Sequence, residues 1–191
     1  MRELIVAEFI TLDGVIQAPG GADEDTEGGF KHGGWTWPYW HDDIGAHFSE
    51  AMAGADALLL GRKTWQIHGG AFEPMEGDEF ADAMNGMPKY VASTTLDSAA
   101  AWRNSTLIRE DVVEAVRRLK EQPGKNILLD GSSVLVQALH DLVDEYALHV
   151  YPIVLGGGKR LFPQGKRLDL TLVEASPLPT GVVFMRYRRA A

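Results

Sequence analysis

The residues best suited to chemistry form a turn, Asp130-Gly131-Ser132-Ser133, that follows an apolar run at residues 127–129. The run is typical of a strand, and a helical pattern of apolar residues begins directly after the turn. A turn that opens a helix presents free backbone N–H groups and the positive end of the helix dipole, which together favour an anion. Serine hydroxyls there either cap the helix or hydrogen-bond a phosphate, and this turn alone leaves both interpretations open.

A second strand-turn-helix pattern carries fixed positive charge. The apolar run at residues 57–60 is followed by Gly61, Arg62, Lys63 and Thr64. The planar guanidinium of arginine fits phosphate oxygens, and lysine adds a point charge. Cations are disfavoured at a helix N-terminus unless an anion offsets them, so the pattern favours a phosphate site over a solvated helix start.

A third turn is rich in hydroxyl groups, because the short strand expected at residues 88–93 runs into Ser93, Thr94 and Thr95. Three such turns together suit a ligand with several phosphates, such as a dinucleotide. We therefore expect a cofactor site built from Gly61, Arg62, Lys63, Thr64, Ser93, Thr94, Thr95, Asp130, Gly131, Ser132 and Ser133.

These segments also carry a family resemblance, which covers nearly the whole chain. Residues 59–65, 91–96 and 130–132 stand in the order and spacing of dihydrofolate-reductase-like proteins, and residues 12–15 and 142–158 add further matches. The chain most closely resembles the C-terminal reductase domain of the bacterial bifunctional deaminase-reductase of riboflavin biosynthesis. The resemblance implies NADPH as cofactor, a mobile loop over the nicotinamide and substrate, and a homodimer.

One departure from the family pattern concerns Asp130-Gly131-Ser132, where the family often has two adjacent glycines or Glu-Gly-Gly. In dihydrofolate reductases that glycine pair holds an unusual cis peptide bond beside the cofactor. The departure puts the cis bond in doubt here, whereas the phosphate-facing role of Gly131 and Ser132 is retained.

The spacing of apolar residues predicts a single α/β domain over residues 1–191, with no deaminase domain. The expected sheet is mixed and mostly parallel, flanked by helices, and ends in a C-terminal antiparallel hairpin. An apolar hairpin edge of this kind invites pairing with a second copy, so we expect a homodimer. Strands are predicted at residues 3–10, 56–60, 88–93, 105–108, 125–129, 144–151, 168–175 and 181–188, and helices at 43–54, 62–68, 77–85, 110–121 and 132–141.

Composition excludes several classes of protein. The 191 residues contain no cysteine, and the six histidines show no tight metal-ligand spacing, so no metal site is expected. The formal net charge of −9 argues against general nucleic-acid binding. No apolar run approaches the roughly 20 residues of a membrane span, and the N-terminus lacks the pattern of a signal peptide, so a cytoplasmic location is expected.

Residues 17–42 form an unusually long polar and glycine-rich segment that ends in Trp35, Trp37 and Trp40. A loop of this length inside a compact domain is usually functional or disordered. Its tryptophans either pin the loop to the core or stack on a planar ligand. On the second interpretation, Trp37 and Trp40 are candidate substrate-binding residues, and residues 17–40 are a lid.

Reduction of an imine or carbonyl needs a proton as well as a hydride, and a buried carboxylic acid can supply it. The candidates are Glu8, Asp13, Asp42 and Asp43. Asp13 follows the first strand, next to Gly14, and could orient substrate, although Asp-Gly is also a common turn. Asp43 is the nearest equivalent of the acid that dihydrofolate reductases place after their mobile loop, although it could equally cap a helix. We take Asp13 and Asp43 as the candidate catalytic residues.

The sequence therefore predicts an NADPH-dependent reductase of a small heterocyclic or ribosylamino-pyrimidine-type substrate, similar to the riboflavin-pathway reductase. One alternative is a dihydrofolate or pteridine reductase. Another is a non-catalytic nucleotide-binding protein on the same fold, because fold does not fix function. The residues do not select the substrate.

Overall fold

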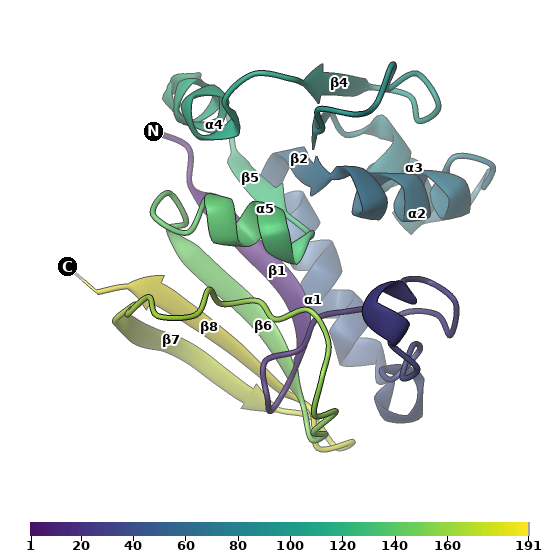
Figure 1. Cartoon of the computed structure of the whole chain (residues 1–191), viewed down its shortest axis with the longest axis vertical. Coiled ribbons are helices and arrows are strands. Elements are labelled where there is room, and N and C mark those ends of the chain that lie inside the picture. The colour runs from purple at the N-terminus through teal and green to yellow at the C-terminus, as the bar shows by residue number, and fades with distance from the viewer. Residues whose placement is uncertain (191) are drawn as a thin grey trace.

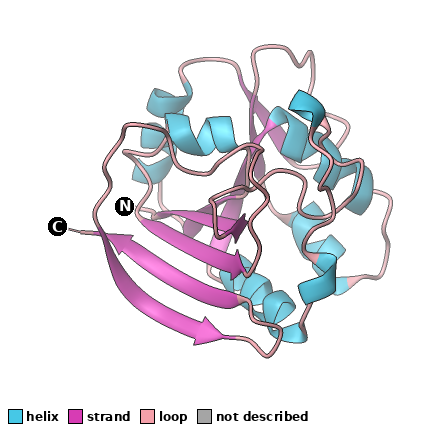
Figure 2. Ribbon diagram, turned by 60° about the horizontal axis from the view of Figure 1, so that its bottom comes forward, coloured by secondary structure: helices cyan, strands magenta, loops and turns pink. Residues whose placement is uncertain are grey.

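The computed structural model describes residues 1–190, and its centre is one eight-stranded sheet in the order β4-β3-β2-β5-β1-β6-β8-β7 (Figures 1 and 2). Strands β1 to β6 are mutually parallel, whereas β8 runs antiparallel to β6 and to β7. The predicted fold class is confirmed. The strands are β1 (Leu4–Thr11), β2 (Ala55–Gly61), β3 (Lys89–Ala92), β4 (Ser105–Ile108), β5 (Asn126–Leu129), β6 (Glu145–Tyr151), β7 (Leu170–Pro177) and β8 (Val183–Arg189).

Helices cover both faces of the sheet because side chains alternate along each strand. Leu58 and Leu60 of β2 pack with α1, α2 and α3, whereas Leu59 between them packs with α4 and α5. The helices are α1 (Asp42–Ala53), α2 (Arg62–Phe72), α3 (Glu79–Gly86), α4 (Val112–Glu121) and α5 (Ser133–Ala138), with short 3-10 turns at Glu27–Gly29 and Trp37–Tyr39. Within residues 1–190, none of these helices has the length and hydropathy needed to cross a bilayer.

Four helices and the C-terminal hairpin differ from the predicted boundaries by two residues or more. Helices α3 and α4 begin two residues later than predicted, after the capping residues Asp78 and Asp111, and α5 ends three residues earlier, at Ala138. Helix α2 continues four residues beyond the predicted end at residue 68, through Gly69 and Gly70. A Cβ at Gly69 would lie 3.2 Å from Trp102, so this glycine serves close packing rather than helix termination. The turn of the C-terminal hairpin lies two residues later than predicted, at residues 178–182, where Leu178 N donates to Val182 O at 2.8 Å, and both strands are shifted with it.

The strands β5 and β1 create the edge on which the predicted site lies. Strand β5 pairs with β1 only as far as Val6, whereas β6 accompanies β1 to its end at Thr11. In the strand order, the connection from β1 leads to β2 on the β4 side of the sheet, and the connection from β5 leads to β6 on the β7 side. The two connections therefore run in opposite directions. In open α/β sheets, ligands bind outside the carboxyl ends of strands at such a switch point.

The long segment after β1 is anchored by one of its tryptophans. Trp35 is buried, its ring packs edge-on to Tyr151 at 5.1 Å between centroids, and its Nε1 donates to Gln17 O at 2.8 Å. Trp37 remains 63% exposed, although its Nε1 donates to Gly20 O at 2.6 Å, and its ring lies 6.1 Å from that of Trp40. The core-pinning interpretation therefore applies to Trp35, and the exposed tryptophans remain available to a ligand.

This difference predicts opposite stability effects for two substitutions in one loop. Trp35→Ala empties a buried site and should lower the free energy of unfolding by about 3–5 kcal/mol. Trp37→Ala removes an exposed ring and should change it by less than about 1 kcal/mol. Urea denaturation of both variants checks this, and equal losses would show that the exposed ring is also structural.

Candidate functional site

Two of the three predicted cofactor turns are in direct contact. Gly61 N at the end of β2 donates to Gly131 O after β5, at 3.0 Å. A Cβ at Gly61 would lie 2.5 Å from Ser132 Oγ, and one at Gly131 would lie 2.7 Å from Thr64 Oγ1. The turns at residues 61–64 and 130–133, nearly 70 residues apart in the sequence, thus form one surface at the carboxyl edge of the sheet.

The Gly131 turn has the special backbone that the sequence left in doubt. The peptide bond between Gly131 and Ser132 is cis, and Gly131 has a φ of +68°, which favours glycine. Asp130 in place of a glutamate or glycine therefore does not prevent the cis bond. A side chain at Gly131 would meet Thr64 of the protein itself, so the glycine is required by packing between the two turns.

The third turn, after β3, lies at the same carboxyl edge. Ser93 N donates to Ile108 O at 3.1 Å, and Ser93 Oγ accepts from the backbone amides of Thr95 and Leu96 at 3.1 and 3.0 Å. Thr94 and Thr95 are exposed and available to a ligand.

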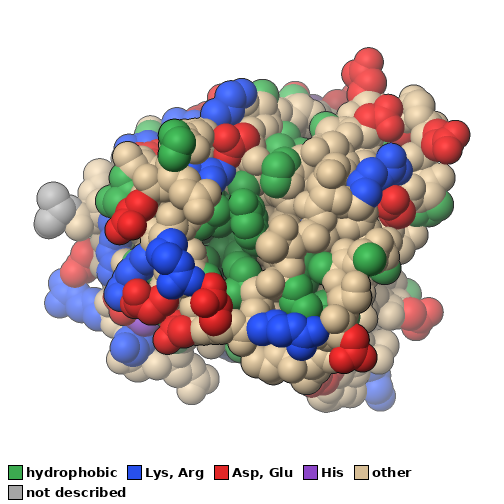
Figure 3. All heavy atoms as spheres, turned by 90° about the horizontal axis from the view of Figure 1, so that it is seen from above, with side chains coloured by type: hydrophobic (Ala, Val, Ile, Leu, Met, Phe, Trp, Pro, Cys, Tyr) green, Lys and Arg blue, Asp and Glu red, His purple; other side chains and the backbone are tan. Residues whose placement is uncertain are grey.

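A cavity of about 450 Å³ lies beside this third turn, between α4, β3 and β4. It is lined by apolar residues, including Tyr90 and Ile108, and by charged residues: Arg109, and Arg118 in an ion pair with Glu110. Figure 3 looks onto this end of the molecule, where hydrophobic side chains gather in a hollow bordered by charged groups.

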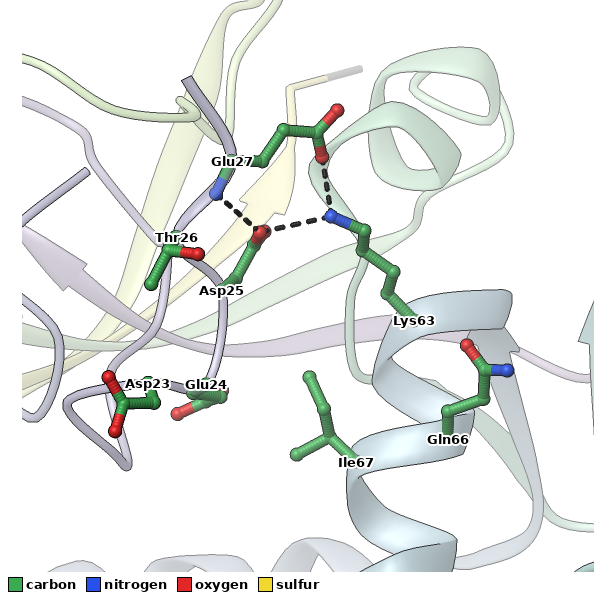
Figure 4. A pocket seen from close by; sticks show the side chains of 8 residues that line it. All are labelled: Asp23, Glu24, Asp25, Thr26, Glu27, Lys63, Gln66 and Ile67. Carbon is green, nitrogen blue, oxygen red and sulfur yellow. Dashed lines mark hydrogen bonds and ion pairs between the residues drawn. The ribbon is translucent and has the colours of Figure 1, made fainter. Parts of the chain in front are cut away.

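The two cations of the second turn have different surroundings. Arg62 bonds only Gln66, at 3.1 Å, and pairs with no carboxylate in the described part of the chain. Lys63 instead forms ion pairs with Asp25 at 3.0 Å and Glu27 at 2.5 Å, two acids of the long loop (Figure 4). Local sequence patterns do not predict this pairing, because Asp25 and Glu27 precede Lys63 by 38 and 36 residues.

A second lysine completes this cluster of charges. Lys159, after β6, reaches Asp25 at 2.5 Å and Glu27 at 2.6 Å, so two lysines and two acids tie the loop to α2. Hydrogen bonds from Lys159 and Lys63 hold the pKa of Glu27 at about 2. Glu27 therefore stays ionised at neutral pH, and its contribution to stability is lost only as the pH falls from about 4.5 toward 2. Between the loop and α2 lies a cavity of about 390 Å³.

A group of acids with unusual environments lies beside the Gly131 turn. Burial raises the pKa of the Glu8 carboxyl well above its ordinary value, and the charge of Asp130 raises it further. Asp130 itself lies 2.9 Å from His68 Nε2 of α2. Glu24 of the long loop binds the amides of Gly20 and Gly21, yet burial leaves its pKa raised.

The two acids preferred from the sequence have other surroundings. Asp13 accepts from Thr11 Oγ1 at 2.6 Å and from Gly156 N at 2.8 Å, and these bonds lower its pKa, so it stays a carboxylate that anchors the segment after β6. Asp43 is exposed in the first turn of α1, where its amide donates to the capping side chain of His41. Glu8, also among the sequence candidates, has the burial that a proton-donating acid needs.

Comparison with known proteins identifies the family of this architecture. The RibD C-terminal domain matches residues 2–184. The uncharacterized protein YyaP of Bacillus subtilis is 31% identical over 193 residues, which cover 97% of this chain and 94% of that protein.

Two solved structures share the fold. A protein of Shewanella sp. PV-4, named provisionally for riboflavin biosynthesis, has a TM-score of 0.70 at 21% identity, with 99% of each chain covered. Dihydrofolate reductase of Enterococcus faecalis, in complex with NADP(H) and RAB-propyl, has a TM-score of 0.65 at 16% identity, with 99% of this chain and 97% of that chain covered. The chain therefore belongs to the RibD C-terminal domain family, a family of reductases.

Proposed function

We propose that this protein is an NADPH-dependent reductase of a small heterocyclic or ribosylamino-pyrimidine-type substrate. The observation that carries the proposal is the direct contact between the Gly61 and Gly131 turns at the carboxyl edge of the sheet. It groups backbone amides, hydroxyls and an unpaired guanidinium, as a ligand with several phosphates requires. Membership in a reductase family supports the same conclusion.

The three turns suggest how the cofactor would be held. Thr64 and Ser132 border the contact between two turns and would face the pyrophosphate, while Arg62 and Thr94 would bind the 2′-phosphate of NADPH. The cavity beside Ser93 would take the adenosine end, since apolar residues line it and Arg109 lies at it without a carboxylate partner among residues 1–190. When bound, the cofactor supplies a hydride, and the protein has to align it with the substrate and exclude water.

The substrate would lie under the loop at residues 17–40. Trp37 and Trp40 are exposed there and offer stacking surfaces, while the charge cluster keeps the loop close to α2. Loop closure over a reacting centre commonly gates turnover.

A panel of pteridines, ribosylamino-pyrimidines and simple cyclic imines, assayed by NADPH absorbance, tests the function. Turnover with one class would name the substrate. Tight NADPH binding without turnover on any acceptor would instead assign a nucleotide-binding role, and absence of NADPH binding would overturn the cofactor proposal.

The unequal surroundings of the two cations predict unequal effects on cofactor binding. Arg62→Ala should raise the Kd for NADPH about 10–100-fold, because a charge-assisted hydrogen bond contributes about 1.5–3 kcal/mol. The Kd for NADH should change less, since NADH lacks the 2′-phosphate. Lys63→Ala should have a smaller effect than Arg62→Ala, because Lys63 is already paired with loop acids. Equal losses for NADPH and NADH would refute the 2′-phosphate assignment.

The loop acids should compete with cofactor phosphates for Lys63. Asp25→Asn combined with Glu27→Gln frees both lysines of the cluster and should lower the Kd for NADPH roughly 3–10-fold. The matched control is Asp23→Asn with Glu76→Gln, which removes two exposed acids that form no ion pair within residues 1–190. An equal gain in the control would attribute the effect to net charge alone.

The exposed edge strand β7 supports the expectation of a homodimer. Leu172 and Val173 are about half exposed on β7, whereas Val182 and Phe184 of the same hairpin are buried within the chain. Replacing Leu172 and Val173 by lysine should convert a dimer to a monomer, because charge on an edge strand opposes pairing. Light scattering at micromolar concentration checks this, with Thr106→Lys on the opposite edge strand β4 as control. A monomeric wild-type mass would end the proposal.

A further inference from the structure

Glu8 lies on the part of β1 that β5 does not accompany. Beyond Val6, β1 has a paired strand only on its β6 side, where Glu8 is in register with Leu148. On the other side, the chain has turned away into Asp130 and Gly131. Glu8 is buried, with only 6% of its surface exposed. Its Oε1 has no hydrogen-bond donor among residues 1–190.

A buried carboxyl oxygen without a hydrogen-bond donor is costly for a fold, so the retention of Glu8 calls for an explanation. Glu145, on the neighbouring strand β6, provides the comparison because it is equally buried, at 5% exposed. Its two oxygens pair with Arg188 at 3.0 Å and Arg186 at 3.7 Å, which makes it a structural ion pair. Glu8 has no such cation. The groups that act on it are the backbone amide of Gly131 and the carboxylates of Asp130 and Glu24.

We propose that Glu8 is the catalytic acid that protonates the reduced substrate, and that the Asp130–His68 pair returns a proton to it after each turnover. This inference rests on the reductase function proposed above. In this proposal Glu8 contacts the substrate directly, whereas Asp130 and His68 act on the reaction only through Glu8.

The electrostatics agree with this geometry. Burial raises the pKa of Glu8, and the nearby carboxylates of Asp130 and Glu24 raise it further, while the Gly131 backbone amide opposes them. Burial lowers the pKa of His68, but the charge and hydrogen bond of Asp130 outweigh that effect and leave it raised. Burial and the nearby carboxylates thus favour the neutral form of Glu8. His68 and Asp130 form a hydrogen-bonded pair within reach of solvent, each about a quarter exposed.

The proposed step balances in atoms and charge. A hydride from NADPH forms a C–H bond at the carbon of a C=N or C=O group, whose π electrons move to the heteroatom. The Oε–H bond of Glu8 breaks and its proton forms the N–H or O–H bond, leaving NADP⁺, reduced substrate and the Glu8 carboxylate. His68 then delivers a proton through Asp130 and takes a new one from water.

The first test uses Glu8→Gln, which keeps the shape of the side chain but removes the exchangeable acid. Infrared spectra of the wild type at pH 7 should contain a protonated-carboxyl band that is absent from this variant. Glu121→Gln, an exposed acid at the end of α4, should leave that band unchanged. Identical bands in wild type and Glu8→Gln would overturn the proposal whether or not the enzyme is active.

The second test separates proton donation from hydride transfer. With a neutral cyclic imine at pH 8, Glu8→Gln should lower kcat about 100-fold or more, and Glu8→Asp should restore part of it. With an N-methylated, permanently charged iminium of the same ring, hydride transfer needs no proton, so both variants should match the wild type. Equal losses on both acceptors would assign Glu8 a structural role. Wild-type protein inactive on every acceptor would reject the reductase function itself, and the proposal with it.

The third test addresses the return of the proton. His68→Gln should leave the first turnover at the wild-type rate and slow later ones, which would be visible as a burst of NADPH oxidation. A first turnover slowed as much as the steady state would remove His68 from the relay.

Discussion

The contact between the Gly61 turn and the Gly131–Ser132 turn is the constraint on which the site depends. A Cβ at Gly61 would collide with the side chain of Ser132, and a Cβ at Gly131 would collide with the side chain of Thr64. The close approach brings the start of α2 against the end of β5 and leaves the last part of β1 without a neighbour on that side. Phosphate-binding groups and the buried acids thereby come together at one edge of the sheet.

The long loop is held at this edge by charge as well as by packing. Trp35 fixes its second half in the core, while Asp25 and Glu27 fix its first half to Lys63 and Lys159. The lysines and Glu27 are partly exposed, and ion pairs of that kind are individually weak, so it is the cluster of four charges rather than one pair that holds the loop. The position of the loop therefore depends on whether Lys63 is paired with Asp25 and Glu27, and cofactor phosphates would compete for the same lysine.

Patterns local in the sequence carried most of the fold and part of the site. The strand-turn-helix units, the mixed sheet and the hairpin follow from hydrophobic spacing and turn residues. Contacts between distant segments did not, since nothing in the spacing of Asp25 and Lys63 or of His68 and Asp130 indicates that they meet. The predicted end of α2 at residue 68 was wrong because Gly69 packs against Trp102, and helix propensity, which disfavours glycine, does not include such a contact.

The acids show most clearly why residue type does not establish a role. Asp13 lies at a strand end, where a catalytic group is expected, yet hydrogen bonds keep it ionised. Glu8 and Glu145 occupy adjacent parallel strands and are buried to a similar extent. Two arginines neutralise Glu145, whereas the charged groups that act on Glu8 are two carboxylates. Burial with a counter-charge yields a structural ion pair, and burial among like charges yields a neutral acid. Strand pairing causes the difference between the two glutamates. Strand β8, which pairs with β6, supplies the arginines that bind Glu145, whereas β5 ends before Glu8 and the chain continues there into Asp130.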